Sequence, residues 1–281
     1  MVIDLHTHSS ISDGTEPPRG VLEAAATCGI DVLALTDHDT TAGWDEAAAA
    51  VPLTGVCLVR GIEISTSRAG RSIHLLGYLL DGAHAALQAE LAQVRSSRRT
   101  RMDRMVQAMA ADGIPISLTE VHAQLTPGAT LGRPHLADAL VAKGVVPHRD
   151  AAFRDYLHDE SPYYVSHYAI DPVHAVQLVH AAGGVAVIAH PFTTTRGRAM
   201  DPVLVEELAA VGLDGIEAHH RDHTDQGVAL ALRLAAALGL LVTGSSDYHG
   251  TGKPNRLGEN TTSPAVLAAI EERGALPVIR P

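Results

Sequence analysis

The stretch "DLHTHSSISDG", residues 4–14, ends an apolar strand pattern that starts at residue 2 and then turns polar. Side chains alternate between the two faces of a strand, so His6 and His8 point to the same side. Asp13 follows five residues later, in the next loop. A strand that only packs a core has no use for two imidazoles on one side. We therefore expect His6 and His8 to point together at something that binds imidazole.

Short apolar runs of the same kind recur along the chain, and amphipathic segments at 18–28, 201–211 and 226–238 lie between several of them. This alternation of strands and helices is typical of a largely parallel sheet with crossover helices. About seven such units would close into a distorted α/β barrel that carries its polar residues at the C-terminal ends of the strands. The expected strands cover residues 2–6, 31–36, 56–64, 73–79, 185–189, 215–218 and 240–244, with a further candidate at 276–279.

The alternation stops between residues 87 and 169, where helical patterns follow one another without a strand pattern. The sequence predicts an α-helical insertion at 87–169 over the mouth of a barrel formed by 1–86 and 170–281. In "SLTE", Ser117 and Glu120 have the spacing of a capping box. We interpret the basic run at 95–104 as a solvated helix face rather than an RNA-binding track.

Composition narrows the class of protein. The chain has 281 residues, is 46% hydrophobic and 19% charged, and carries a net charge of -11. It can bury a large core, and its negative charge argues against binding long duplex nucleic acid. No basic segment precedes an apolar one at the N-terminus, and no apolar run reaches about 18 residues. The only two cysteines, Cys28 and Cys57, are expected in apolar surroundings as inert thiols. Together these features predict a cytoplasmic protein without a membrane or an obligate protein partner.

Histidine and carboxylate residues gather at the ends of six expected strands. Each one alone has an ordinary explanation, since a loop histidine is usually hydrogen-bonded and an aspartate after a strand usually caps a helix. Their coincidence at one rim instead favours a metal site with Zn, Mn or Fe. Two or three ions are expected, with Glu63 as a bridge. The candidates are His6, His8, Asp13, Asp37, His38, Glu63, His74, His190, Asp247 and His249.

The motifs "HTHSSISDGT", "ALTDHDT", "GIEIS", "IHLLGY", "IAHP" and "GSSDYHG" together resemble those of the PHP (polymerase and histidinol phosphatase) family of metal-dependent phosphoesterases. The resemblance implies a distorted (β/α)7 barrel with a trinuclear site. One ion would be bound by His6, His8, Glu63 and Asp247, a second by Glu63, His74 and His190, and a third by Asp13, His38 and His249. Some family members have His in place of Asp13, a difference that favours Mn or Mg over Zn. Mn is thus the first choice, with Zn, Fe or Mg as alternatives.

The insertion resembles one branch of this family through "LGRPHLADALV" at 131–141, followed by Tyr163, Tyr164 and His167. Members of that branch remove the 3′-phosphate from 3′,5′-bisphosphate nucleotides, and some trim short RNA from its 5′ end. The resemblance makes Arg133 and His135 candidates for binding phosphate, since arginine offers a bidentate fork. Further candidates for contacts with phosphate, ribose or metal are Lys253, Asn255, Arg256, His219, His220 and His223.

The expected reaction is metal-dependent hydrolysis of a nucleotide phosphomonoester to a 5′-nucleotide and phosphate. Asp13, His190 and Asp37 are the catalytic candidates; the proton for the leaving oxygen could come from Asp37 or from a metal-bound water. The alternatives are a 5′→3′ exoribonuclease on short RNA and a histidinol-phosphate phosphatase. A non-catalytic metal-binding module and an amidohydrolase acting on C–N bonds are candidates from other classes.

Overall fold

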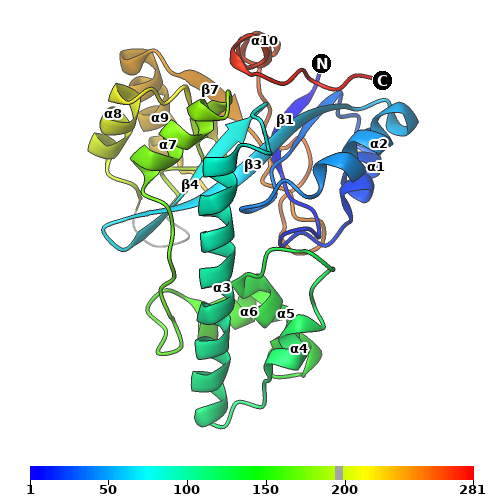
Figure 1. Ribbon diagram of the computed structural model, residues 1–281, viewed down its shortest axis with the longest axis vertical. Helices are drawn as coiled ribbons and strands as arrows, with labels where there is room; N and C mark the ends of the chain where they lie inside the picture. Colours follow the sequence, from blue (N-terminus) through cyan, green and yellow to red (C-terminus); the bar gives the residue numbers. More distant parts are fainter. Residues whose placement is uncertain (194–198) are drawn as a thin grey trace.

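A seven-stranded sheet that is nearly closed into a barrel forms the centre of the molecule in the computed structural model, which describes residues 1–193 and 199–281 (Figure 1). The strands follow one another in the sheet in chain order. The edges meet where His8 N donates to Tyr248 O over 2.8 Å. The strands are β1 (Ile3–Thr7), β2 (Val32–Leu35), β3 (Cys57–Arg68), β4 (Arg71–Tyr78), β5 (Val185–Ile188), β6 (Gly215–His219) and β7 (Leu241–Gly244).

The sheet is parallel except around β4, which is antiparallel to both β3 and β5. No helix separates β3 from β4; a tight turn at Ala69 and Gly70, with φ of 53° and 76°, joins them directly. Because β4 runs in the opposite direction, its first half lies at the rim where the other strands end. His74 in this half pairs with Ser65, two residues beyond Glu63 on β3. Because of this hairpin, His74 lies near the start of β4 and still reaches the rim where the parallel strands have their C-terminal ends.

Helices cover the outside of the sheet, with α1 and α2 against one half and α7, α8 and α9 against the other (Figure 1). Four of them begin with a side chain that caps the first turn, and three of these have proline at the next position, where it costs no hydrogen bond. The expected helices at 18–28, 201–211 and 226–238 are found within a few residues. The bounds are α1 (Pro18–Thr27), α2 (Trp44–Thr54), α7 (Pro172–Ala181), α8 (Pro202–Ala210), α9 (Asp225–Leu238) and α10 (Pro264–Arg273).

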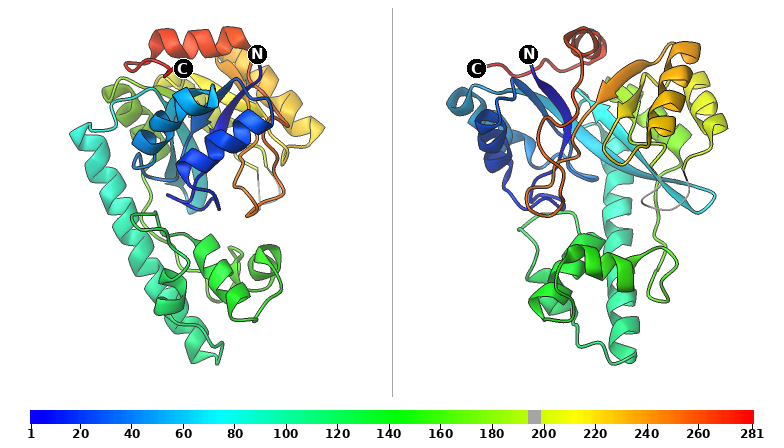
Figure 2. Two further views of the ribbon diagram at one scale, coloured as in Figure 1. Left: turned by 90° about the vertical axis from the view of Figure 1, so that its right-hand side faces the viewer. Right: turned by 180° about the vertical axis from the view of Figure 1, so that it is seen from behind.

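A helical segment lies beside the loops that follow β1 and β7, at one end of the barrel (Figure 2). The long helix α3 runs from the sheet to the far end of this segment, and the shorter helices pack against its outer half. They bury a hydrophobic cluster of their own that includes Met105, Leu136 and Leu157. The capping box of Ser117 and Glu120 is present. The helices are α3 (Ala85–Ala111), α4 (Leu118–His122), α5 (Arg133–Ala142), α6 (Arg149–Ala152) and the π-helical turn η1 (Phe153–Leu157).

The basic face of α3 contacts the barrel, so the interpretation of residues 95–104 as a solvated face is wrong for part of the run. Arg95 Nη1 donates to Asp39 O over 2.6 Å. Arg98 donates to Asp39 Oδ2 over 3.0 Å and to Ser65 Oγ over 2.6 Å. Arginines three residues apart share one helix face, and this face is turned towards the loops of β2 and β3.

Two smaller expectations need correction. Residues 276–279 do not form a strand; Ile279 makes only an isolated bridge with Leu58. Cys28 and Cys57 are free thiols, but Cys28 is exposed rather than set among apolar side chains. In the part of the chain that the structure describes, no helix is long and apolar enough to cross a membrane.

Candidate metal centre

The end of β1 delivers two imidazoles to the same point, as the alternation of the strand predicts. His6 and His8 are both fully buried, and their Nε2 atoms lie 3.1 Å apart. Thr7, between them, turns the other way and donates to Ala34 O over 2.7 Å. The loop then folds so tightly that a Cβ at Gly14 would lie 2.4 Å from His8 O. Glycine at this position therefore lets Asp13 turn back towards His8.

A first group of four possible ligand atoms comprises the Nε2 atoms of His6 and His8 with one oxygen each of Glu63 and Asp247. The Nε2 atom of His8 lies 3.1 Å from Glu63 Oε2 and 3.3 Å from Asp247 Oδ1. The Nε2 atom of His6 lies 3.3 Å and 3.4 Å from the same two oxygens. A tetrahedron of ligands at 2.0–2.1 Å from an ion has edges of about 3.3–3.4 Å. The spacing of these atoms therefore fits one bound metal ion.

A second group lies on the other side of the His8 ring and comprises His8, Asp13, His38 and His249. Asp13 Oδ1 is 3.2 Å from His249 Nε2 and 3.7 Å from His8 Nδ1, while Asp13 Oδ2 is 3.7 Å from His38 Nε2. His249 Nδ1 donates to the carbonyl of Asp247 over 2.7 Å. The proton on Nδ1 leaves the lone pair of Nε2 facing Asp13, which is the tautomer that a metal ligand needs.

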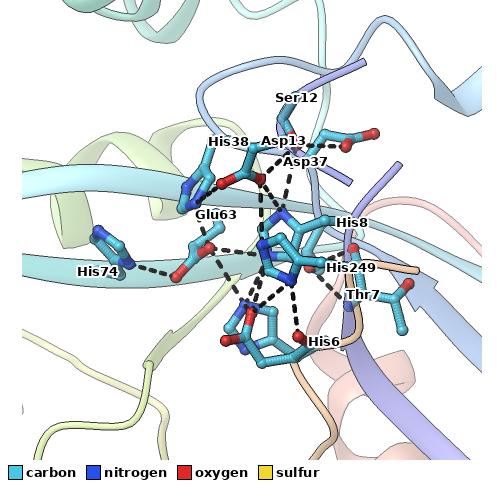
Figure 3. Close-up of polar contacts among 12 residues, drawn as sticks. His6, Thr7, His8, Ser12, Asp13, Asp37, His38, Glu63, His74 and His249 are labelled. Carbon is cyan, nitrogen blue, oxygen red and sulfur yellow. Dashed lines mark hydrogen bonds and ion pairs between the residues drawn. The ribbon is translucent and has the colours of Figure 1, made fainter. Parts of the chain in front are cut away.

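Glu63 connects these groups to a third one (Figure 3). Its Oε2 atom faces His6 and His8 and is also 3.1 Å from His38 Nδ1. Its Oε1 atom is 2.6 Å from His74 Nδ1 and 3.3 Å from His190 Nε2. The two oxygens of one carboxylate thus face different sets of imidazoles, as expected for a bridging ligand between ions. The family resemblance grouped His74 with His190, and in the structure His38, which faces Oε2, also forms a group of possible ligands with Glu63 and His74.

The carboxylates of the centre are ionised at neutral pH. Burial alone would raise their pKa values, but the imidazoles around them more than compensate. The pKa of Asp13 is well below its usual range because of His249 and His38, and that of Glu63 because of His38 and His74. For Asp247, Lys253 and His249 have the same effect. Buried imidazole nitrogens and ionised carboxylates form a donor set that suits divalent metal ions.

Glu217 belongs to the centre although the sequence analysis did not select it. It is fully buried on β6 and accepts from His6 Nδ1 over 3.1 Å through Oε1. Its Oε2 accepts from the backbone N of His190 over 2.9 Å, where His190 has a φ of 28°. Burial opposes the charge, but His6 and other imidazoles lower the pKa of Glu217 to about 2. One carboxylate therefore fixes the His6 ring with Nε2 inward and also stabilises the unusual backbone of His190.

Asp37 lies behind the ligand groups and orders the loop after β1. Its oxygens accept from Ser9 N and Ser9 Oγ over 2.8 Å and 2.7 Å, and from Ser12 Oγ over 2.6 Å. Burial raises the pKa of Asp37, and His8 and the serine hydrogen bonds oppose this only in part. Ser12 Oγ also lies 3.4 Å from Asp13 Oδ1. Asp37 is thus connected to the second ligand group through Ser12 (Figure 3).

Three histidines near β6 have different surroundings. His220 Nδ1 accepts from Asp222 N over 3.2 Å, so its Nε2 carries the proton; this Nε2 lies 3.6 Å from Asp247 Oδ2, too far for a hydrogen bond. His223 Nδ1 donates to Ala218 O over 2.9 Å, and its Nε2 accepts from Phe192 N over 3.1 Å. His219 is exposed. In this state none of the three presents a lone pair to the ligand groups.

Four of the candidates for substrate contacts, Lys253, His135, Arg133 and Arg256, are distributed unevenly around the centre. Lys253 Nζ lies 2.8 Å from Asp247 Oδ2 and lines a cavity of about 510 Å³ between the helical segment and the barrel loops. His135 Nδ1 accepts from Gly132 N over 3.1 Å at the start of α5. Arg133 donates to Leu157 O and to Asp159. Arg256 is 84% exposed and lies 3.8 Å from Glu259. Lys253 is therefore the candidate in direct contact with a residue of the ligand groups.

Known proteins resemble the chain along almost its whole length. A sequence model described as the PHP domain matches residues 4–93. A 3′,5′-nucleoside bisphosphate phosphatase of Chromobacterium violaceum is 34% identical over 99% of this chain and 98% of its own. A 5′-3′ exoribonuclease of Haemophilus influenzae is 35% identical over 88% of this chain and 89% of its own. The crystal structure of a proposed metal-dependent phosphoesterase from Bifidobacterium adolescentis is 40% identical, with a TM-score of 0.94 over 97% of this chain and 96% of its own. The similarity extends through the helical segment as well as the barrel.

Proposed function

The chain belongs to the PHP family of metal-dependent phosphoesterases, and from this premise we propose that it removes the 3′-phosphate from nucleoside 3′,5′-bisphosphates. Water would be consumed, and a 5′-nucleotide and inorganic phosphate would be formed. The observation that carries the proposal is that the two oxygens of Glu63 face different imidazoles, with His6, His8 and His38 at Oε2 and His74 and His190 at Oε1. Adjacent ions in such a site can bind both the attacking and the leaving oxygen of a phosphate ester.

We assign the ligands from the distances within each group. His6, His8, Glu63 and Asp247 would bind one ion. The other side of Glu63, with His74 and His190, would bind a second, and Asp13, His38 and His249 a third. Mn is the proposed metal because oxygen and imidazole ligands without thiolates suit it. Bound divalent ions supply Lewis acidity, which lowers the pKa of a water and neutralises charge on the phosphate.

The protein groups around the ions have separate roles in this proposal. Asp13 and His190 are catalytic, since each would contact an ion at the reacting phosphate. We assign Asp37 to positioning the loop after β1, because its oxygens already accept three hydrogen bonds from Ser9 and Ser12. The leaving ribose oxygen would then take its proton from water. Residues 87–169 would cover the site as a helical subdomain and restrict the access of bulk water.

A second candidate is a 5′→3′ exoribonuclease on short RNA. The similarity to the Haemophilus influenzae exoribonuclease over 88% of the chain supports it. Both reactions hydrolyse a phosphate ester at a ribose 3′-oxygen, so the same metal centre can serve either one. The two differ in whether a further nucleotide must fit next to the scissile phosphate.

Assays of phosphate release and of mononucleotide release, both with added Mn, separate the candidates. The substrates are adenosine 3′,5′-bisphosphate, a 5′-phosphorylated tetraribonucleotide and histidinol phosphate. We expect the highest kcat/KM for the bisphosphate and no activity after chelation of the metal. Faster release of mononucleotides from the tetranucleotide would favour the exoribonuclease. Metal binding without hydrolysis of any of these esters would identify a non-catalytic metal-binding module and overturn the proposal.

A further inference from the structure

Arg149, the first residue of α6 in the helical segment, contacts the barrel loop that carries Asp13. Its Nε and Nη2 atoms form a two-point ion pair with the carboxylate of Asp138 on α5. Its Nη1 atom donates to the backbone carbonyl of Asp13 over 3.2 Å. Burial opposes the charge, but Asp138 and Asp13 raise the pKa of Arg149. A second bond from the helical segment, from Thr130 N to Ile11 O over 2.9 Å, fastens the same loop.

The guanidinium of Arg149 also lies against the loop that follows β7. A Cβ at Gly252 would overlap with Nη1 of Arg149, so glycine leaves the room that the guanidinium occupies. Gly252 N donates to His249 O over 3.2 Å, which closes a turn on His249. Thr15 N donates to the same carbonyl over 3.2 Å. One side chain of the helical segment therefore contacts both loops whose side chains, Asp13 and His249, face each other.

His38 is the remaining ligand that we assign to the same ion, and α3 contacts the residue that follows it. Asp39 is fully buried and has a φ of 55°. Arg95 donates to its carbonyl over 2.6 Å and Arg98 to its carboxylate over 3.0 Å. These bonds stabilise an unusual backbone conformation next to His38. The helical segment thus contacts the chain at, or within three residues of, every ligand of this ion.

The ion assigned to His6 and Asp247 is supported from within the barrel instead. Glu217 on β6 accepts from His6 Nδ1 over 3.1 Å. Asp4 on β1 accepts from Ser246 N over 3.0 Å, one residue before Asp247. Neither support involves the helical segment. The two ions should therefore differ in how strongly they depend on the position of that segment.

We propose that Arg149 is a positioning residue that couples the seating of the helical segment on the barrel to metal binding by Asp13, His38 and His249. This inference rests on the ligand assignment of the proposed function but not on the identity of the substrate. Asp13 Oδ1 and His249 Nε2 lie 3.2 Å apart, close to the separation of two ligands of one ion. Arg149 holds this separation by contacting both loops at once. Without it the ion loses affinity, because partners behind the ligands set their orientation.

The test measures Mn binding by calorimetry on metal-free protein, without any substrate. Arg149→Met removes the guanidinium. The matched control is Arg154→Met in η1, since the Arg154 side chain is 68% exposed and pairs with its neighbour Asp155. We expect R149M to weaken one Mn site roughly 10- to 100-fold and to leave the other sites as in wild type, while R154M changes none. An equal weakening at all sites, or no weakening at any, would overturn the inference.

Asp13→Asn identifies the affected ion. Because D13N removes a ligand of that ion, adding R149M to D13N should lower Mn affinity by less than a further twofold. A larger additional loss would place the effect at another ion and overturn the inference. None of these measurements needs turnover. If the protein hydrolyses no phosphate ester but its Mn binding depends on Arg149 in this way, the proposed function fails and the coupling stands.

Arg149→Lys separates the geometry of the side chain from its charge. Lysine offers one nitrogen in place of the three that contact Asp138 and Asp13, so R149K should weaken the same Mn site, by a smaller factor than R149M. Should R149M not fold, R149K takes its place in the comparison with R154M and in the D13N background. Wild-type Mn binding in R149K would then overturn the inference.

Discussion

The metal centre and the arginine cluster (Arg101, Arg133, Tyr164 and His167) both bring buried charge together, but they balance it differently. In the metal centre, carboxylates and imidazoles from the strands alternate, and Glu63 alone lies within 3.3 Å of five imidazoles. Around Arg101, by contrast, Arg133, Arg98 and the ring of Tyr164 are neighbours, and Asp159 is the carboxylate that acts on its charge. In the proposed function, the metal centre is the region that performs the chemistry.

The largest effect should follow from removing a ligand in the metal centre. Asp13→Asn and His190→Ala should each lower kcat by on the order of 10³-fold or more, because the phosphate loses its electrostatic stabilisation. Steady-state assays with Mn measure the loss, and circular dichroism checks that the fold is intact. Full activity in either variant, with its metal content measured, would contradict the ligand assignment.

A substitution at Glu217 should have a smaller effect on activity than the loss of a ligand of the metal centre. Glu217→Gln should weaken Mn binding by about 10- to 100-fold, since the amide positions His6 less firmly. Activity titrated with Mn should recover at high concentration, so that kcat changes less than the metal requirement. Glu206→Gln, at an exposed position on α8, is the matched control. A loss of kcat that excess Mn does not restore would show that Glu217 does more than position ligands.

Combining the two regions tests their independence. If the arginine cluster and the metal centre act separately, any losses of E217Q and Arg101→Met in kcat/KM for the bisphosphate at saturating Mn should multiply within about twofold. The double variant and both single variants are assayed side by side. A double loss much smaller than the product would mean that the two regions act as one unit, and the comparison would no longer hold.

The smallest effect is expected at Arg256. Its side chain is 84% exposed and lies 3.8 Å from Glu259, a geometry that contributes little to stability. Arg256→Ala should change KM for the bisphosphate less than about twofold and leave the melting temperature within error. An increase in KM of tenfold would instead place substrate beside the loop after β7.

The sequence predicted much of the metal centre because strands impose a simple rule. Alternation along β1 places His6 and His8 on one side, and the order of strands brings Asp247 to them. Glu217 follows the same alternation, since it pairs in regular register with Thr243 and points inward. The register shift comes after it and leaves His219 exposed. In the sequence, His219, His220 and His223 are more obvious candidates than Glu217. In the structure, however, it is Glu217 that contacts two possible ligands, His6 and His190.

The arginine cluster could not be predicted in the same way. Arg101, Arg133 and His167 are 32 and 34 residues apart, and they lie on a helix, at a helix start and in a loop. No short period relates such positions; packing of the helical segment brings them together. The resemblance to known sequences pointed to Arg133 and His167, but Arg101 looked like one more charge on a soluble helix. The burial of Arg101 becomes apparent only when the packing of the helical segment against α3 is known.

Helix α3 has a consequence for protein engineering. Its 27 residues span about 40 Å, with one half fixed to the barrel and the other half supporting the helical segment. Arg95 and Arg98 fasten it to Asp39 and Ser65, which belong to the barrel. A transplant of the helical segment onto another barrel must therefore carry these four anchoring residues with it. Without them the graft would hold its own core but lie at the wrong angle to the acceptor's catalytic centre.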